Sequence, residues 1–231
     1  SSGEMFICTD ATANANVWIN IGGGFGNYGK SFGGKGPGTV AGYTACGYDG
    51  SQQNIIDKFT FGSANNAGDH GDISVARFRS TGHSSQTHGY AASGETAINC
   101  NIIDKFPFAA GSGAVDHGDL SVGVRYGKAA GASSATDGYS LGGQLNSTSA
   151  FTSVIQRFNF TSNSTSNTHG NLTVPRNVAS GHSSDTHGYA SAGSATSPAL
   201  EVTIDKFVFA SESDATDHGD LLVARYGGCG H

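Results

Sequence analysis

The stretch Ile56-Asp57-Lys58-Phe59-Thr60-Phe61 decides the fold, because three further copies of it follow along the chain. Those copies are Ile103-Asp104-Lys105-Phe106-Pro107-Phe108, Ile155-Gln156-Arg157-Phe158-Asn159-Phe160 and Ile204-Asp205-Lys206-Phe207-Val208-Phe209. Their first isoleucines are 47, 52 and 49 residues apart. Self-similarity at such a period is typical of repeat architectures, in which each unit buries its apolar face against a neighbour.

Two more blocks accompany each copy in a constant order. A Gly-Tyr pair precedes the copy, and a block that ends in arginine follows it. The pairs are Gly42-Tyr43, Gly89-Tyr90, Gly138-Tyr139 and Gly188-Tyr189. The arginine blocks span Asp69–Arg77, Asp116–Arg125, Thr168–Arg176 and Asp217–Arg225. Three ordered blocks that recur four times predict four units of common structure.

Alternation with a period of two predicts that these blocks are β-strands. One face of the first such strand takes Ile55, Asp57, Phe59 and Phe61. The segment Ile73–Arg77 alternates in the same way, and the extra residue Val124 in the second copy predicts a β-bulge. Pro175 lacks an amide donor, so the third arginine block is predicted to be an edge strand. Each unit is expected to be a meander of three or four strands that stacks on its neighbours.

Composition excludes several classes of partner. Only 13% of the 231 residues are charged, and the net charge is -6, so nothing indicates binding to nucleic acid. No apolar run approaches the length of a membrane span, so membrane insertion is not expected. The cysteines show no C-x-x-C spacing and allow two disulfides or none; we expect free, packed thiols and no zinc site. They are Cys8, Cys46, Cys100 and Cys229.

The order of blocks resembles the kelch repeat of β-propellers, which has about 50 residues and four strands per blade. The resemblance extends from Gly38 to Arg225. It implies an all-β, kelch-like β-propeller array of four blade-like repeats over residues 39–231. Four blades are enough to close a propeller. A solenoid-like or intertwined homo-oligomeric fibre is the alternative architecture.

A second resemblance concerns the source of the chain. The segment Gly3–Gly22 resembles a hairpin of tailed-phage structural proteins, with strands at Met5–Cys8 and Val17–Ile21. The repeated Ile-Asp-Lys-Phe, Asp-x-Gly-Asp-Leu and Thr-His-Gly-Tyr motifs resemble arrays in virion proteins of marine phages. These likenesses imply a virion component on the particle surface. The first resemblance also implies a β-hairpin at 1–22, and the glycine-rich composition of residues 23–38 predicts a linker before the array.

Two residue types recur once in every unit, and both are candidates for chemistry. The histidines are His70, His117, His169 and His218. A metal site would require several of them to converge on one ion, so we expect instead that each binds a turn or a neighbouring backbone carbonyl. The arginines are Arg77, Arg125, Arg176 and Arg225. Our hypothesis is that each arginine bridges backbone or carboxylate groups of the next unit, because a guanidinium can serve several acceptors.

The sequence contains no nucleophile elbow, zincin motif or phosphate-binding loop, so we predict a protein without enzymatic activity, catalytic residues or cofactor. Two connections, Gln144–Thr152 and Ser194–Val202, differ sharply from the matching segments of the other units. Variable loops on a repeated scaffold are where binding usually occurs. The candidate binding residues are Gln144, Asn146, Thr148, Ser194 and Thr196.

These observations favour a tail fibre or capsid fibre that displays the array and binds a glycan or protein on a host surface. One alternative is a purely structural spacer or decoration protein, whose partners are other virion proteins or copies of itself. Another is an extracellular glycan-binding repeat protein of cellular origin.

Overall fold

A computed structural model describes residues 5–10, 17–22, 40–96, 100–125, 129–145, 148–196, 199–228 and 230. Every regular element in these ranges is a β-strand. No helix in this part of the chain is long and apolar enough to cross a membrane. The chain divides into two compact parts, Ser1–Lys30 and Ser31–His231. In the first part, β1 (Met5–Asp10) pairs antiparallel with β2 (Val17–Gly22); the predicted linker 23–38 lies outside the described residues.

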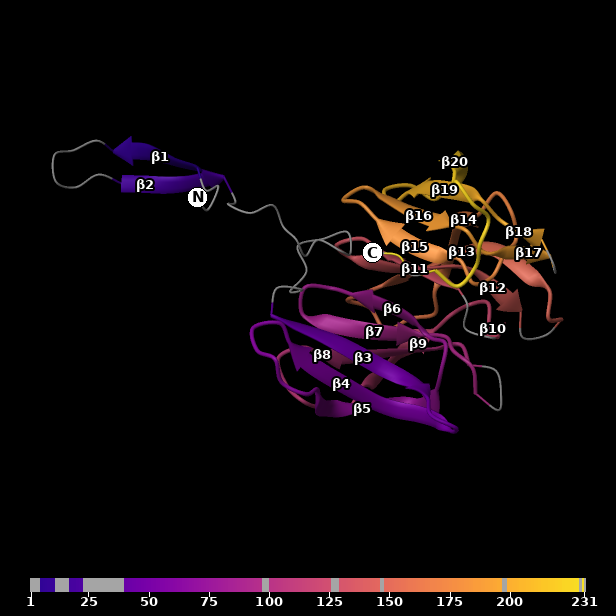
Figure 1. Ribbon diagram of the computed structural model, residues 1–231, viewed down its shortest axis with the longest axis horizontal. Helices are drawn as coiled ribbons and strands as arrows, with labels where there is room; N and C mark the ends of the chain where they lie inside the picture. The colour runs from indigo at the N-terminus through magenta and orange to yellow at the C-terminus, as the bar shows by residue number, and fades with distance from the viewer. Residues whose placement is uncertain are drawn as a thin grey trace. The chain divides into compact units, whose positions relative to one another are not determined.

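In the second part, each repeat forms one antiparallel sheet whose strands follow chain order (Figure 1). Unit 1 contains β3 (Ala41–Tyr48), β4 (Gln52–Thr60) and β5 (Gly68–Arg77). Unit 2 contains β6 (Thr81–Ser84), β7 (His88–Ala92), β8 (Ile102–Pro107) and β9 (Val115–Asp119). Unit 3 contains β11 (Ala130–Ser133), β12 (Asp137–Leu145), β13 (Phe151–Asn159) and β14 (Asn167–Asn171). Unit 4 contains β15 (Ser180–Ser183), β16 (His187–Ser191), β19 (Thr203–Val208) and β20 (Thr216–Asp220). The prediction of an all-β array of meanders is therefore confirmed.

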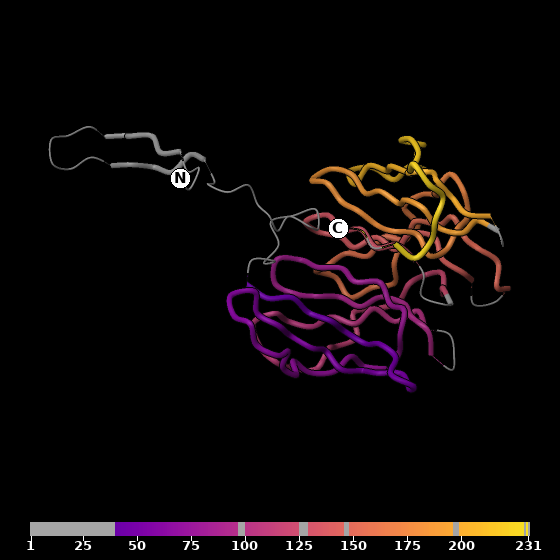
Figure 2. The backbone as a smooth tube through the Cα atoms, in the orientation of Figure 1, coloured from indigo at the N-terminus to yellow at the C-terminus, as the bar shows by residue number. Residues whose placement is uncertain are grey.

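The first strands of units 2, 3 and 4 lie side by side, with β11 between β6 and β15 (Figure 2). Glycine makes this approach possible: a Cβ atom on Gly181 would lie 2.1 Å from the carbonyl oxygen of Gly131. A Cβ atom on Gly230 would lie equally close, at 2.1 Å, to the carbonyl oxygen of Gly181. Gly230 thus occupies the position at which the first strand of a further unit would begin.

The hydrophobic core lies between the units rather than within each sheet. The cluster between units 1 and 2 joins Ile56 and Ile73 to Ala91 and Phe106. The next interface buries Phe158 and Phe160 of unit 3 under residues of unit 2 that include Tyr90, Ile103, Leu120 and Val124. The last interface buries Phe207 of unit 4 under Tyr139, Leu141, Ile155 and Leu172 of unit 3. A single twisted sheet exposes both faces, so each unit obtains its core only by stacking.

The arginine blocks depart from the predicted strands in three of the four units. Only in unit 1 does the final strand run unbroken to its arginine. In unit 2 the chain leaves the sheet after Asp119, and β10 (Val124–Arg125) pairs with β12 of unit 3. The β-bulge predicted at Val124 is therefore wrong. β14 ends at Asn171, so Pro175 lies beyond the edge strand rather than within it.

The Gly-Tyr pairs have a steric explanation. Each of these glycines lies beneath the phenylalanine of the neighbouring strand, and a Cβ atom on Gly138 would lie 2.3 Å from Cζ of Phe158. The same distance is 2.3 Å for Gly42 and Phe59. The two rings differ in how far they can move aside, since Phe158 is 2% exposed and Phe59 is 40% exposed. A side chain at Gly138 would therefore force the core apart, whereas Phe59 can turn toward solvent.

We predict that Gly138→Ala lowers the free energy of unfolding by about 1–3 kcal/mol, the usual cost of overpacking. Gly42→Ala should cost clearly less, because Phe59 can move. Gly68→Ala is the control, since no atom lies within 4 Å of the added methyl group. Denaturant titrations of the three variants measure the difference. Equal stability of Gly138→Ala and Gly68→Ala would contradict the steric argument.

Candidate functional site

The recurrent histidines form the same contact at every internal interface. Each lies at 2–4% exposure and donates from Nε2 to a main-chain carbonyl of the next unit at 2.8 Å. The pairs are His70 with Pro107, His117 with Asn159, and His169 with Val208. Because a carbonyl only accepts, the contact selects the Nε2–H tautomer. Burial lowers the pKa of His117, which favours the same neutral form.

The recurrent tyrosines reinforce this contact. Their hydroxyl groups donate to carbonyl oxygens of the next unit at 3.0, 3.0 and 3.5 Å. The pairs are Tyr43 with Phe108, Tyr90 with Phe160, and Tyr139 with Phe209. Burial raises the pKa of Tyr90 and of Tyr139 to about 12, so both remain donors at physiological pH. Histidine and tyrosine thus supply donors to backbone oxygens at the stacked faces. The Phe108 and Phe160 oxygens also accept from Lys58 and Lys105, at 3.5 and 3.0 Å.

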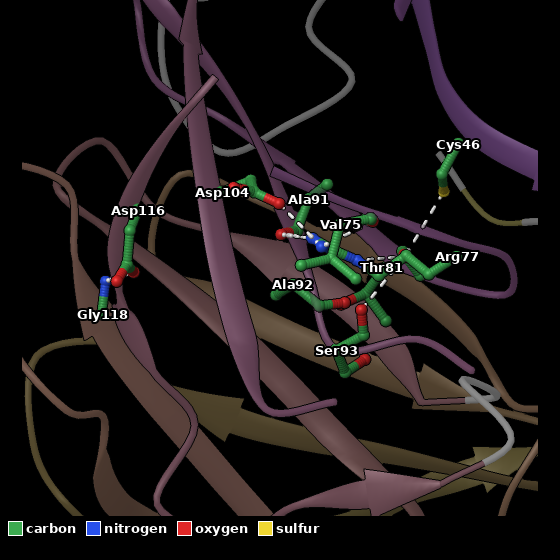
Figure 3. A network of polar contacts seen from close by, with 11 residues as sticks. Cys46, Val75, Arg77, Thr81, Ala91, Ala92, Ser93, Asp104, Asp116 and Gly118 are labelled. Carbon is green, nitrogen blue, oxygen red and sulfur yellow. Dashed lines mark hydrogen bonds and ion pairs between the residues drawn. The ribbon is translucent and has the colours of Figure 1, made fainter. Parts of the chain in front are cut away.

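The arginines of units 1 and 3 extend into the following unit and are fully buried there. Arg77 Nη1 lies 2.7 Å from Asp104 Oδ2, and Arg77 Nη2 donates to the carbonyl of Ala91 at 2.9 Å (Figure 3). Arg176 forms the equivalent ion pair with Asp205 and donates to the carbonyl of Ala190 at 3.2 Å. Both carboxylates and both guanidinium groups are 0% exposed. Each buried charge is therefore paired with a charge of the adjacent unit rather than solvated by water.

The interface between units 2 and 3 replaces the carboxylate with an amide. Gln156 occupies the position of the aspartates, is 0% exposed and receives hydrogen bonds from the Val122 amide and the Ser121 hydroxyl. Its own Nε2 donates to the Val122 carbonyl at 3.0 Å. The Arg125 side chain lies outside the described residues. Sequence reasoning did not identify the Asp/Gln position as the partner, although its constant place directly after the repeated isoleucine carries that signal.

The connections divide the array into two ends of different character. At one end, which we call the uniform end, the turns after each first strand span 85–87, 134–136 and 184–186. The connections between third and fourth strands, at the same end, span 61–67, 108–114, 160–166 and 209–215. At the opposite end, which we call the variable end, the connections between second and third strands span 49–51, 93–101, 146–150 and 192–202. Variation in length is therefore confined to one end.

Four of the five candidate binding residues belong by their numbers to connections at the variable end, and Gln144 lies just before one of them, in β12. Gln144 donates to the Ser149 carbonyl at 2.6 Å, and the exposed Thr148 accepts from the Ala150 amide at 3.3 Å. Ser194 lies in β17 (Ser194–Thr196), which pairs with β18 (Ala199–Leu200). Asn146 and the side chain of Thr196 lie outside the described residues. Units 3 and 4 thus place these two connections on adjacent sheets.

The variable end also carries an aromatic and charged cluster that sequence reasoning missed. We call it the Tyr48 cluster, and it comprises Tyr48, Phe78, Arg79 and Glu95. The Tyr48 ring is 62% exposed and lies 5.0 Å from the ring of Phe78. The Arg79 guanidinium lies 4.8 Å above the Phe78 ring and 2.6 Å from Glu95 Oε2. Tyr48 ends β3 directly before the shortest variable connection, and Phe78 lies between β5 and β6, where it forms a β-bridge with Glu95 of unit 2. The local sequence does not reveal this meeting.

Neither metal ligation nor thiol chemistry is evident among the residues that the structure describes. No group of three or more His, Cys, Asp or Glu side chains converges there. Cys46 and Cys100 are free thiols, and Cys46 donates to the Ser80 hydroxyl at 3.3 Å. Burial raises the pKa of Cys100, which disfavours the reactive thiolate.

Comparison with known proteins gives a structural relative only. No protein-family model and no curated protein matches the chain. Among solved structures, that of YjhT matches with a TM-score of 0.63 over 83% of this chain and 68% of that chain, at 10% sequence identity. At this identity the likeness concerns the fold alone, an all-β arrangement of the β-propeller type.

We predict that Arg77→Ala lowers the free energy of unfolding by about 3–5 kcal/mol, because Asp104 is left buried and unpaired. The double variant Arg77→Met, Asp104→Leu should recover part of this loss, since neither charge remains. Arg79→Ala is the matched control, because Arg79 is 41% exposed and its pair with Glu95 is worth about 1 kcal/mol or less. Denaturant unfolding checks all three. A loss no larger for Arg77→Ala than for Arg79→Ala would refute the role of the buried pair.

We also predict that stability falls in mild acid through His83. This ring is 4% exposed, donates from Nδ1 to the Ala132 carbonyl at 3.1 Å, and meets the Phe158 ring at 5.0 Å. Burial lowers its pKa from 6.5 to about 4. Between these values the unfolded chain binds more protons than the folded one. The free energy of unfolding should therefore fall by about 3 kcal/mol as the pH drops from about 6.5 to about 4.

Unfolding measured across this pH range tests the prediction on His83→Gln. The variant should show a shallower loss than the parent protein. His182→Gln is the control, because His182 holds the equivalent position in unit 4 and is only partly buried. An unchanged pH profile in His83→Gln would show that other groups cause the loss.

Proposed function

We propose that the chain is a non-enzymatic display scaffold that binds a host-surface glycan or protein through its variable end. The confinement of length variation to that end carries the proposal. At the uniform end, the turns after the first strands are even built alike. Ser85, Ser134 and Ser184 each accept, through Oγ, the amide of the residue three positions later at 3.0–3.1 Å. A scaffold that holds one end constant and varies the other is suited to recognition.

The Tyr48 cluster supplies chemistry that fits a carbohydrate. The apolar C–H face of a sugar ring can stack on an exposed aromatic ring such as Tyr48. Sugar hydroxyls can accept from Arg79 and donate to Glu95, which lie beside that ring. Few other charges are present in a chain with 13% charged residues, so recognition would rest on stacking and hydrogen bonds rather than on long-range attraction.

The virion setting rests on the resemblance of the N-terminal segment and of the repeat motifs to phage structural proteins. We propose on that basis that the chain is a tail-fibre or capsid-fibre component, and that its four units are blades of a kelch-like propeller array. The order of strands within each unit and the structural likeness to YjhT support the second statement. A structural spacer remains the competing function, and the absence of any surface ligand would favour it.

We predict saturable binding of labelled full-length protein to an oligosaccharide array or to candidate host cells. Tyr48→Ala should weaken this binding at least about tenfold, because loss of one stacked ring removes about 1–1.5 kcal/mol beyond area burial. Replacing residues 146–150 with the short 49–51 connection tests the contribution of unit 3.

Asp185→Ala is the control for the binding assay. Asp185 is exposed and lies in a turn at the uniform end, so binding should be unchanged. No binding by the folded protein on either probe would reject a recognition function and favour the spacer. Equal losses in the Tyr48 and Asp185 variants would reject the variable end as the binding surface.

A further inference from the structure

The array ends in two faces that are buried wherever they occur inside it. We call the face of unit 1 that no earlier unit covers the leading face. Its Phe59 and Phe61 are 40% and 54% exposed, and Ile55 is 43% exposed. The rings that correspond to Phe59 in the later units, Phe106, Phe158 and Phe207, are 4%, 2% and 1% exposed. Three large apolar side chains in one place are thus exposed, because none of the described units covers this face.

The opposite face of unit 4, which we call the trailing face, is open in the same way. His218 and Arg225 are exposed there, whereas His70 and Arg77 of unit 1 are 4% and 0% exposed. A cavity of about 430 Å³ opens on this face and is lined by residues that include Tyr189, Ile204, Leu221 and Arg225. The cavity lies where the aspartate and phenylalanine of a following unit would enter.

The two faces carry the two halves of one interface. Every internal boundary joins a histidine to a carbonyl, a tyrosine to a carbonyl and a buried cation or amide to its partner. Asp57 and the Thr60 carbonyl stand in the leading face at the positions of Asp104 and the Pro107 carbonyl. Arg225 and His218 stand in the trailing face at the positions of Arg77 and His70. Both Asp57 and Arg225 are exposed, so each lacks the burial that its counterparts have.

Glycine packing gives an independent indication. Gly71, Gly118 and Gly170 each lie against the backbone of the next unit, and a Cβ atom would lie 2.7, 2.5 and 2.1 Å from its atoms. Gly219 holds the same position in unit 4, with a φ of 129° that matches the 130° of Gly71, and nothing lies within 4 Å of its Cβ position. The close approach that this glycine permits is therefore unused within the chain.

We propose that the trailing face of one copy of this chain binds the leading face of a second copy, head to tail. The contact would reproduce the internal boundary, with Arg225 paired to Asp57, His218 donating to the Thr60 carbonyl, and Tyr189 packed on Phe59 and Phe61. Such a contact is heterologous, so it closes into a ring or continues as a filament. The occupant is a second copy rather than the chain's own unit 1, because both faces stay exposed in the folded single chain.

Gly230 extends the same argument to the first strands of the units. It packs on Gly181 as Gly181 packs on Gly131. Within the described residues, β3 pairs only with β4, whereas the second strands of units 2, 3 and 4 also pair with a first strand. A docked copy would bring its β3 next to Gly230, where a first strand begins.

Charge reversal tests the proposal on the full chain. Sedimentation velocity of the parent protein over a range of concentrations should show reversible association. Arg225→Asp and Asp57→Arg should each raise the dissociation constant at least about tenfold, because like charges then meet at the contact. The double variant Arg225→Asp, Asp57→Arg should associate again, and so should a mixture of the two single variants. Both positions are exposed, so folding should not change, and circular dichroism checks this.

Two further variants test the apolar part of the contact and provide a control away from it. Phe61→Asn removes apolar contact from the leading face without a charge change and should also weaken association. Asp185→Arg, away from both faces, should leave it unchanged. A parent protein that remains monomeric at all concentrations would overturn the proposal, and it would point to closure within one chain or to a different partner. Association that survives both single reversals would overturn it as well.

Discussion

The contact between consecutive units is the constraint on which the rest of the structure depends. Each sheet is too thin to bury its own apolar side chains, so Phe106, Phe158 and Phe207 become core residues only under the preceding unit. The stacked faces leave backbone carbonyls away from water, and they bury Arg77 and Arg176 at two of the boundaries. The recurrent histidines and tyrosines donate hydrogen bonds to these carbonyls, and the aspartates form ion pairs with the buried arginines.

The same constraint separates stability from recognition. Most contacts that hold the units together lie on the sheet faces, and the turns at the uniform end are constant in length. At the variable end the strand ends still join units, as in the pairing of Val124–Arg125 with β12, but the connections beyond them differ in length. The Tyr48 cluster joins Tyr48 of unit 1 to Glu95 of unit 2 through Phe78 and Arg79, so a surface there can be assembled across a boundary. A repeated array thus offers a composite binding surface at low structural cost.

An array built from one type of boundary has exposed interface residues at its two ends. Phe59, Asp57, His218 and Arg225 are ordinary interface residues in a place without a neighbour. Closing a ring, adding a unit or docking another copy would all satisfy them, since the local chemistry is the same. The assembly that we propose would therefore use the same set of interactions as folding.

From sequence alone, the number of units, their all-β character and the places of the invariant histidine and arginine were predictable, because alternation and spacing are local signals. Three features came only from tertiary structure. These are the pairing of Val124–Arg125 with the next unit, the identity of Asp104 and Asp205 as arginine partners, and the Tyr48 cluster. Each joins residues of different units, and the path by which the chain leaves one sheet and enters the next determines which side chains meet.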